Sequence, residues 1–273
     1  MSSYKKLLFI GGGNIAGAVA CGLVNKKTLP ADYVTVYDID DSKFEKFKKL
    51  GINVSTDLTA SCAEAEYIFL AVKPGIVKTV MKQLSEIDAL LDRVIIVSFA
   101  AAVFIDHIIN AAGRQCAVIR TMPSTPILVG EGVLAVTKNE LVSSKAFEFF
   151  CRMMSSIAFV TNVTEDQMNP IISVHGSSPA YVYLFIKSMV DAAIKQGIDY
   201  ETALPLILKT IKGSVTMVER SDESIDQLIK NVASPNGTTL AALKSFANDD
   251  FAGSVERAMD ACTKRANEIS DEL

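Results

Sequence analysis

The sequence is poor in the side chains that most often carry metal or nucleophilic chemistry. Its 273 residues include only two histidines, His107 and His175, and five cysteines that are scattered without C-x-x-C spacing. The scattered positions of the cysteines argue against a zinc site or a disulfide framework. They predict reduced thiols in a cytoplasmic protein. Neither a Ser-His-Asp nor a Cys-His arrangement can be argued from these residues. We therefore expect no metal site and no nucleophilic mechanism.

The chain also lacks a basic block and a membrane-length apolar run. Its net charge is −4, so we expect no nucleic-acid partner. The longest apolar stretch, Val94–Ile105, has 12 residues, too few to span a bilayer, and the N-terminal residues leave no room for a secretory signal peptide. The composition is nevertheless 49% hydrophobic with a mean hydropathy of +0.29. This points to apolar surface that is buried between subunits of a cytoplasmic protein.

What the sequence does contain is a glycine-rich turn between a strand and a helix. Leu7–Ile10 is a short apolar run typical of a buried parallel strand, and a helical pattern of apolar residues follows the glycines. Gly11, Gly13 and Ala16 fit the G-x-G-x-x-G/A spacing of a dinucleotide-binding loop. In that loop the first glycine makes the turn, the second admits the pyrophosphate, and the helix N-terminus holds the phosphates. A generic glycine-rich turn of an α/β protein is the alternative interpretation.

Strand and helix patterns alternate from Leu7 to about Val160, which predicts a doubly wound, mostly parallel α/β domain. Helices are expected from near Ser42, from near Val103 and over Ser143–Met154, and a loop is expected at Lys73–Gly75. The further strands are expected at Val34–Tyr37, from Val54, and at Tyr67–Val72, Arg93–Ser98, Ala117–Met122, Gly132–Val136 and Ala158–Val160.

After Thr161 the pattern becomes entirely helical. Helices are expected at Asp166–Val174, Pro179–Gln196, Thr202–Glu219, Ser224–Asn231, Thr238–Asn248 and Phe251–Ile269. The second of these is apolar nearly all round, so it must be buried on most sides. We therefore expect two domains, residues 1–162 and 163–273, with the helical domain forming a subunit interface.

Several positions have both a functional and a structural interpretation. Asp38 ends the second strand, where an acidic residue binds the ribose 2′-hydroxyl of NAD, but with Asp40 and Asp41 it could only cap the next helix. The small residues of Phe99–Ala101 could admit a nicotinamide or simply pack. The turn at 232–239 puts hydroxyls and free N–H groups at a helix start, which suits a small carboxylate, or Thr238 could merely be the N-cap.

Five motifs in order give the chain a resemblance to a known family. They are Gly-Gly-Gly-Asn-Ile-Ala at 11–16, Ala-Val-Lys-Pro-Gly at 71–75, Arg-Thr-Met-Pro-Ser-Thr-Pro at 120–126, Gly-Ser-Ser-Pro-Ala-Tyr at 176–181 and Ser-Pro-Asn-Gly-Thr-Thr at 234–239. The chain resembles pyrroline-5-carboxylate reductase, the last enzyme of proline biosynthesis, almost from end to end. The last motif is the most specific of the five.

The resemblance implies an N-terminal Rossmann domain and an all-α C-terminal dimerisation domain. It implies reduction of the C=N bond of 1-pyrroline-5-carboxylate to L-proline by NADPH or NADH, in a homodimer whose dimers assemble further. Substrate would be held by Val232, Ser234, Gly237, Thr238 and Thr239, with Thr239 as the catalytic hydroxyl beside the ring nitrogen. The cofactor would be held by Ile10, Gly11, Gly12, Gly13, Asn14, Ile15, Asp38, Ala71, Val72, Lys73, Pro74, Phe99, Ala100 and Ala101.

Two departures from the family pattern and two alternatives remain open. His175 stands where the family usually has a small residue, and Asn236 stands where glycine is usual, although asparagine tolerates a left-handed backbone. A 3-hydroxyacid dehydrogenase of similar layout would carry a lysine early in the helix after Gly176, whereas this chain has none before Lys187. The other alternative is a non-catalytic nucleotide-binding scaffold, against which the intact Thr238-Thr239 turn argues.

Overall fold

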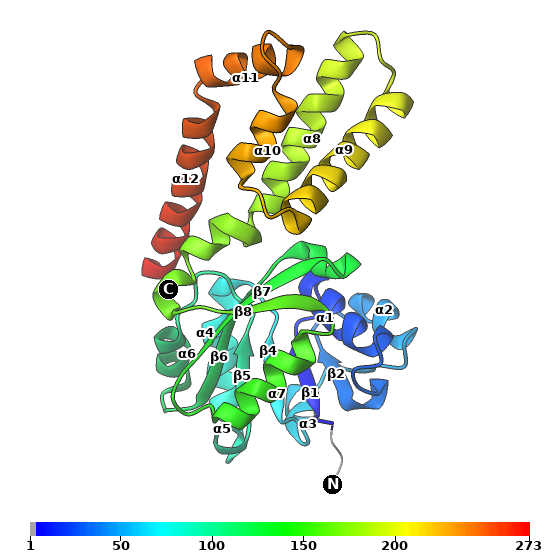
Figure 1. Cartoon of the computed structure of the whole chain (residues 1–273). Helices are drawn as coiled ribbons and strands as arrows, with labels where there is room; N and C mark the ends of the chain where they lie inside the picture. The colour runs from blue at the N-terminus through cyan, green and yellow to red at the C-terminus, as the bar shows by residue number, and fades with distance from the viewer. Residues whose placement is uncertain (1–3) are drawn as a thin grey trace. The chain divides into compact units, whose positions relative to one another are not determined.

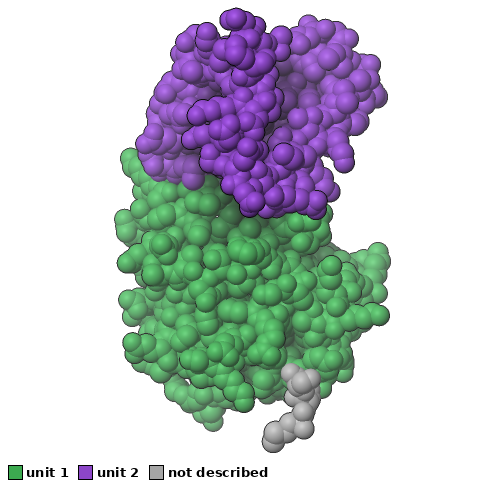
Figure 2. All heavy atoms as spheres, in the orientation of Figure 1, with its two compact units in different colours: residues 1–177, 262–273 green, residues 178–261 purple. Residues whose placement is uncertain are grey.

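The computed structural model describes residues 4–273, so Met1–Ser3 of the first predicted domain lie outside the described residues. The chain forms two compact units (Figure 2). The first runs up to Ser177 and also takes in Cys262–Leu273, and the second is Ser178–Ala261. The predicted domain boundary between residues 162 and 163 coincides with the end of the last strand of the sheet, whereas the first compact unit continues to Ser177. The predicted domain boundary stays a prediction.

Within residues 4–273 the first unit contains one eight-stranded sheet in the order β3-β2-β1-β4-β5-β6-β7-β8 (Figure 1). All neighbouring strands pair in parallel except β6 and β7. The strands are β1 Leu7–Ile10, β2 Val34–Tyr37, β3 Asn53–Ser55, β4 Tyr67–Leu70, β5 Ile95–Ser98, β6 Ala117–Pro123, β7 Gly132–Lys138 and β8 Ala158–Asn162. The predicted doubly wound, mostly parallel sheet is confirmed.

Both faces of the sheet are covered, which explains the continuous apolar run of β1. Leu7 and Phe9 enter the core on one face, and Leu8 and Ile10 enter the core on the other. The first face is covered by α1 Asn14–Asn25, α2 Glu45–Lys48 and α7 Ser144–Met154. The second is covered by α3 Leu58–Cys62, α4 Pro74–Ser85, α5 Leu90–Arg93 and α6 Ile105–Ala112. Alternation of side chains along a strand places successive residues on opposite faces.

Two expected elements next to strand ends have different boundaries in the structure. The predicted loop at Lys73–Gly75 is wrong beyond Lys73, because Pro74 is the first residue of α4. Proline suits that position, since its missing N–H would be unpaired there in any case. Strand β5 starts at Ile95 rather than Arg93, because Arg93 ends the short helix α5 and donates to carbonyls of Cys62 and Ala65.

Three expected helices of the first unit are shorter or differently built. The helix expected near Ser42 is a 3₁₀ turn, Asp41–Lys43, followed by the single turn of α2, and the helix expected near Val103 starts at Ile105. The helix expected at 166–174 is wrong. It is a 3₁₀ turn at Glu165–Gln167 and a π-helical turn at Ile172–Gly176. Pro170 between them has no N–H to continue a helical ladder.

The second unit is helical, as predicted, but it buries few of its apolar side chains. It contains α8 Ser178–Lys195, α9 Tyr200–Arg220, α10 Ile225–Val232, α11 Thr238–Asn248 and the first part of α12 Phe251–Asp271. Val190 of α8 packs with Ala203 and Ile207 of α9 in a small core. Leu184, Leu206 and Met217 are about 60% exposed within the chain.

No helix among the residues that the structure describes is both long and apolar enough to cross a membrane.

Candidate active site

The predicted cofactor-binding residues of the first unit gather at one edge of the sheet. They follow the carboxyl ends of β1, β2, β4 and β5, and these strands are neighbours in the order β2-β1-β4-β5. The order of the strands reverses at the centre of this row. From β1 the chain continues to β2 on one side, and from β4, on the other side of β1, it continues to β5 in the opposite direction. Ligands of open α/β sheets bind at such a switch point.

Gly11 and Gly13 have different physical reasons to be glycine. Gly11 has a φ of +104°, and a Cβ there would lie 2.7 Å from the carbonyl oxygen of Ala71. Its N–H donates to Tyr37 at 2.8 Å, so the loop is held between β2 and the segment after β4. An added Cβ at Gly13 would meet no atom within 4 Å, and Gly13 is the N-cap of α1 without a side-chain cap. The space beside Gly13 and the N–H groups of α1 suit a pyrophosphate.

Asp38 contacts the glycine loop directly. The side chain is 6% exposed, and Oδ2 accepts the Gly12 N–H at 2.7 Å while Oδ1 accepts the Asp40 N–H at 2.9 Å. The Nζ of Lys43 lies 3.0 Å from both oxygens. A carboxylate offers about four lone-pair sites, so these contacts use its capacity. In the structure Asp38 braces the loop, and its predicted contact with a ribose hydroxyl stays a prediction.

Helix capping next to Asp38 is performed by its neighbour. Asp40 is the N-cap of the 3₁₀ turn, and its side chain accepts from the N–H of Ser42 at 3.1 Å. Of the two interpretations of the acidic residues, capping is therefore correct for Asp40, whereas Asp38 bonds the backbone of a different loop. Sequence spacing does not reveal that Asp38 bonds the glycine loop and Lys43. These contacts depend on how the 3₁₀ turn brings Lys43 back to Asp38.

Two lysines beside the loop were not among the predicted site residues. Lys43 pairs with Asp38, and the Nζ of Lys46 donates to the carbonyl oxygen of Gly13 at 3.0 Å. Both ammonium groups thus lie next to the expected phosphate position, where positive charge favours an anionic ligand. The sequence shows that both lysines follow β2 closely enough to offset the charge of Asp38, but their contacts with Asp38 and Gly13 are seen only in the fold.

The side chains of the segment after β5 are largely packed in the core. Phe99 is 6% exposed, and its ring lies 5.4 Å from that of Phe69 in the core. The Ala100 N–H donates to Ser98 Oγ at 3.2 Å, and Ala101 is half-buried. Of the two interpretations of Phe99–Ala101, packing holds for the side chains of Phe99 and Ala100, which both lie in the core, and the predicted contact of this segment with the cofactor stays a prediction.

A buried polar network fixes the continuation of this segment. Arg120 of β6 is 2% exposed and donates to Glu165 at 3.3 Å and Asn169 at 2.7 Å. Asn169 in turn donates to the Ser270 hydroxyl at 3.0 Å, and that hydroxyl donates to the carbonyl oxygen of Ala102 at 2.6 Å. The end of α12 is thereby tied to the loop after β5.

The predicted substrate residues, from Val232 to Thr239, form a turn in the second unit. Asn236 has a φ of +60°, which agrees with its expected tolerance of a left-handed backbone. The N-cap of α11 is Gly237, without a side-chain cap, so the interpretation of Thr238 as the N-cap is wrong. A Cβ on Gly237 would clash with Ser234 Oγ. Thr239 is half-buried in the first turn of α11, where N–H groups are free to receive a carboxylate.

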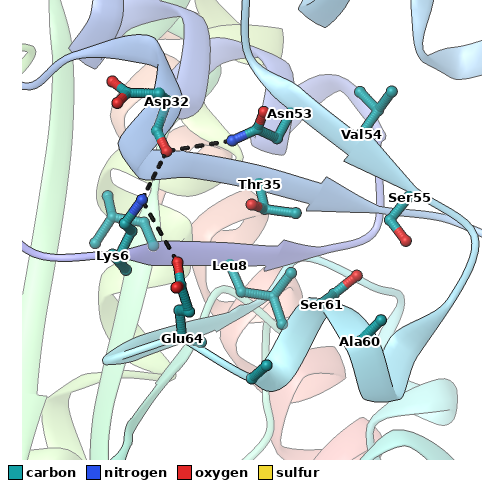
Figure 3. Close-up of a pocket in the computed structure, with 13 residues that line it drawn as sticks. Lys6, Leu8, Asp32, Thr35, Asn53, Val54, Ser55, Ala60, Ser61 and Glu64 are labelled. Atoms are coloured by element: carbon teal, nitrogen blue, oxygen red, sulfur yellow. Dashed lines mark hydrogen bonds and ion pairs between the residues drawn. The ribbon is translucent and has the colours of Figure 1, made fainter.

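A pocket of about 420 Å³ in the first unit lies away from these loops (Figure 3). Lys6, Thr35 and Asn53 line it, together with Leu7, Leu8, Asp32, Val54, Ser55, Ala60, Ser61, Ala63, Glu64 and Ala65. Lys6 Nζ and Asn53 Nδ2 both donate to the Asp32 carbonyl oxygen, at 3.1 and 3.2 Å. Lys6 precedes β1, so the pocket extends to the amino end of that strand, opposite the glycine loop. Among residues 4–273 no group of His, Cys, Asp or Glu could hold a metal ion.

The fold and the loop at its switch point define a dinucleotide-binding α/β protein with a helical second half. Residues 6–102 match the family model described as NADP oxidoreductase, coenzyme F420-dependent, and residues 165–269 match pyrroline-5-carboxylate reductase dimerisation. Pyrroline-5-carboxylate reductase of Escherichia coli is 34% identical over 268 residues, covering 97% of this chain and 98% of the relative. The chain belongs to the pyrroline-5-carboxylate reductase family.

Solved structures agree with this assignment. A Plasmodium falciparum pyrroline carboxylate reductase with NADP bound matches with a TM-score of 0.89 and 29% identity, covering 99% of this chain and 100% of the other. A pyrroline-5-carboxylate reductase from Coxiella burnetii matches with a TM-score of 0.88 and 30% identity, covering 97% and 98%. Both matches include the helical second half as well as the sheet.

Gly13→Val is expected to abolish binding of NADPH and NADH while the protein stays folded. The branched side chain would fill the space beside the loop, where an added Cβ meets no protein atom within 4 Å. Calorimetric titration with both cofactors measures the effect. Gly11→Ala is the matched comparison, and it should also lower the melting temperature because of its positive φ and the contact with Ala71. Undiminished affinity in folded Gly13→Val would refute the assignment of the loop.

Asp38→Asn is expected to destabilise the protein at neutral pH and not in acid. Burial alone would raise the pKa of Asp38, but hydrogen bonds from Gly12, Asp40 and Lys43 bring the pKa below its ordinary value. A depressed folded-state pKa stabilises the fold above the unfolded pKa of about 3.9, and this contribution is lost as the pH falls through the folded value. Chemical denaturation of both proteins from about pH 2 to about pH 8, at intervals of about one pH unit, tests this. A stability difference that does not shrink as the pH falls from about 4 to about 2 would contradict the charged role.

Proposed function

We propose that this chain reduces the C=N bond of 1-pyrroline-5-carboxylate to L-proline, using NADPH or NADH, as the final step of proline biosynthesis. The observation that supports this most is the match to pyrroline-5-carboxylate reductases over nearly the whole chain, with both motif-bearing loops in place. The cofactor loop lies in the first unit and the Ser-Pro-Asn-Gly-Thr-Thr turn in the second.

The proposed roles follow from the chemistry of imine reduction. A nicotinamide cofactor supplies hydride to the carbon of the C=N bond. The glycine loop and the N–H groups of α1 hold its pyrophosphate, and the segments Ala71–Pro74 and Phe99–Ala101 line the remainder. The N–H groups at the start of α11 hold the substrate carboxylate, and Thr239 donates its hydroxyl hydrogen to the ring nitrogen. That bond strengthens as the nitrogen gains electron density, so it favours the transition state.

The lysine that a 3-hydroxyacid dehydrogenase would carry early in the helix after Gly176 is absent from the start of α8. Lys187 is the first lysine of α8, and its side chain is 70% exposed and paired with Asp191 at 2.5 Å. A solvated, paired lysine is a poor proton donor or acceptor for a buried reaction centre. The scaffold alternative has no supporting observation, because the residues proposed to bind substrate and cofactor are all present.

The helical half is proposed to form a homodimer, with further assembly of dimers. The family model that matches residues 165–269 describes dimerisation. Within the single chain the second unit exposes Leu184, Leu206, Met217 and Val232, each more than half exposed. Exposed apolar surface of this extent marks an interaction site. Because the matching family model describes dimerisation, the proposed partner is a second copy of this chain. All five cysteines are free, which fits the proposed cytoplasmic location.

Thr239→Val is expected to lower kcat/KM for the imine by roughly three- to hundredfold while leaving cofactor affinity unchanged. The variant keeps the shape of the side chain and removes a hydrogen bond worth about 0.5–1.5 kcal/mol, or more when a buried partner is left unpaired. Steady-state kinetics and calorimetry measure the two effects. Thr239→Ser should restore most of the activity, and Thr210→Val in α9 serves as the matched control. Full activity in Thr239→Val would mean that another group is the donor.

The double variant Leu184→Lys, Met217→Lys is expected to be monomeric at micromolar concentration, whereas the unmodified chain is a dimer or a larger assembly. Two charges placed on exposed apolar positions of α8 and α9 would have to be desolvated in an interface. Sedimentation velocity measures the change. Leu141→Lys is the control, because Leu141 is 55% exposed but belongs to the first unit. A stable, active monomer of the unmodified chain would disprove the proposed dimer.

A further inference from the structure

His175 is a buried imidazole without a hydrogen-bond partner. The side chain is 9% exposed, and neither Nδ1 nor Nε2 has a partner within the described residues. An imidazole always carries at least one N–H donor, and in its neutral form it also carries one acceptor. Buried polar atoms are nearly always paired, and leaving them unpaired is costly, so both nitrogens of His175 call for an explanation.

The position of His175 in the first unit is at the carboxyl ends of β5 and β6. It lies in the π-helical turn Ile172–Gly176, a rare conformation that recurs at functional sites. A Cβ on the adjacent Gly176 would clash with Met122, which is near the end of β6. Ile172 of the same turn packs with Ala101, Ala102 and Met122 in one apolar cluster. The turn is therefore packed against the segment that follows β5.

This end of the strand row corresponds to the nicotinamide half of a bound dinucleotide. The acidic residue after β2 marks the adenosine end, and the pyrophosphate lies at the glycine loop after β1. The cofactor extends from there past β4 toward β5, because it crosses the switch point of the sheet. The nicotinamide ring carries a carboxamide, which offers one C=O acceptor and one NH₂ donor. The substrate carboxylate already has a proposed site in the turn at 234–239.

We propose that His175 is a positioning residue that hydrogen-bonds the carboxamide of the nicotinamide ring and so orients the ring for hydride transfer. The proposal rests on the proposed function for the identity of the cofactor. Its evidence is the unpartnered side chain of His175 and the place of its turn, in which Ile172 packs with Ala101 and Met122. Burial lowers the pKa of His175, so the imidazole is neutral near pH 7 and retains both a donor and an acceptor for an amide.

The test compares two ligands that differ by the nicotinamide group. Calorimetric titration uses NADPH and 2′-phospho-ADP-ribose, which lacks nicotinamide, with the full chain and with His175→Phe and His175→Gln. The phenylalanine variant should bind NADPH about three- to tenfold more weakly, the loss expected for one neutral hydrogen bond, and bind 2′-phospho-ADP-ribose unchanged. Glutamine keeps a donor and an acceptor, so His175→Gln should recover at least part of the NADPH affinity. That variant also keeps the test valid if the phenylalanine variant does not fold.

Thermal melting without ligand distinguishes this role from a structural one. Replacing two unpaired nitrogens by carbon should leave the melting temperature of His175→Phe equal or higher. His107→Phe is the matched control, since His107 also has an unpartnered buried Nδ1 but lies in α6, and it should change neither affinity. Unchanged NADPH affinity in His175→Phe, or equal weakening of both ligands, would overturn the proposal. If the unmodified chain binds NADPH but does not reduce 1-pyrroline-5-carboxylate, the proposed function fails while the assignment of His175 is still measured.

Discussion

The buried guanidinium of Arg120 connects the parts of the chain on which the nucleotide-binding edge depends. It bonds Glu165 and Asn169, and its planar group lies 4.4 Å from the centre of the Phe104 ring. Glu165 also accepts the Ile105 N–H at 2.7 Å, so the start of α6 is held by the same carboxylate. A buried charge is costly unless it is paired and hydrogen-bonded, and Glu165 and Asn169 supply that pairing here. The loop after β5 therefore takes its shape from three distant segments rather than from its own small residues.

A second constraint acts at the opposite end of the same edge. Asp38 saturates its carboxylate with Gly12, Asp40 and Lys43, so the glycine loop is already organised before a ligand arrives. Preorganisation of this kind lowers the entropic cost of binding. It also changes how the acidic residue after β2 is interpreted, because an engaged carboxylate with a paired lysine repels an added phosphate less than a free one would.

The sequence predicted the strands, the glycine loop and the all-helical second half, because periodic burial and turn residues are local signals. It also located the turn at Asn236, whose left-handed backbone suits asparagine. It failed where tertiary contacts decide. The turn at Ile172–Gly176 depends on Pro170 and on packing near Met122, and the partners of Asp38 depend on the short turn that carries Lys43. His175 could be noticed in the sequence, but its lack of partners is visible only in three dimensions.

The return of residues 262–273 to the first unit has a consequence for the order in which the protein can be made. Asn169 and Ala102 are synthesised 101 and 168 residues before Ser270, which contacts both. Chains emerge from the ribosome from the N-terminus, and domains generally fold as they emerge. Here the nucleotide-binding unit cannot complete its polar network until the whole second unit has been translated. The second unit is thus an insertion in the first, and an interrupted translation that stops before Ser270 leaves the loop after β5 without its anchor.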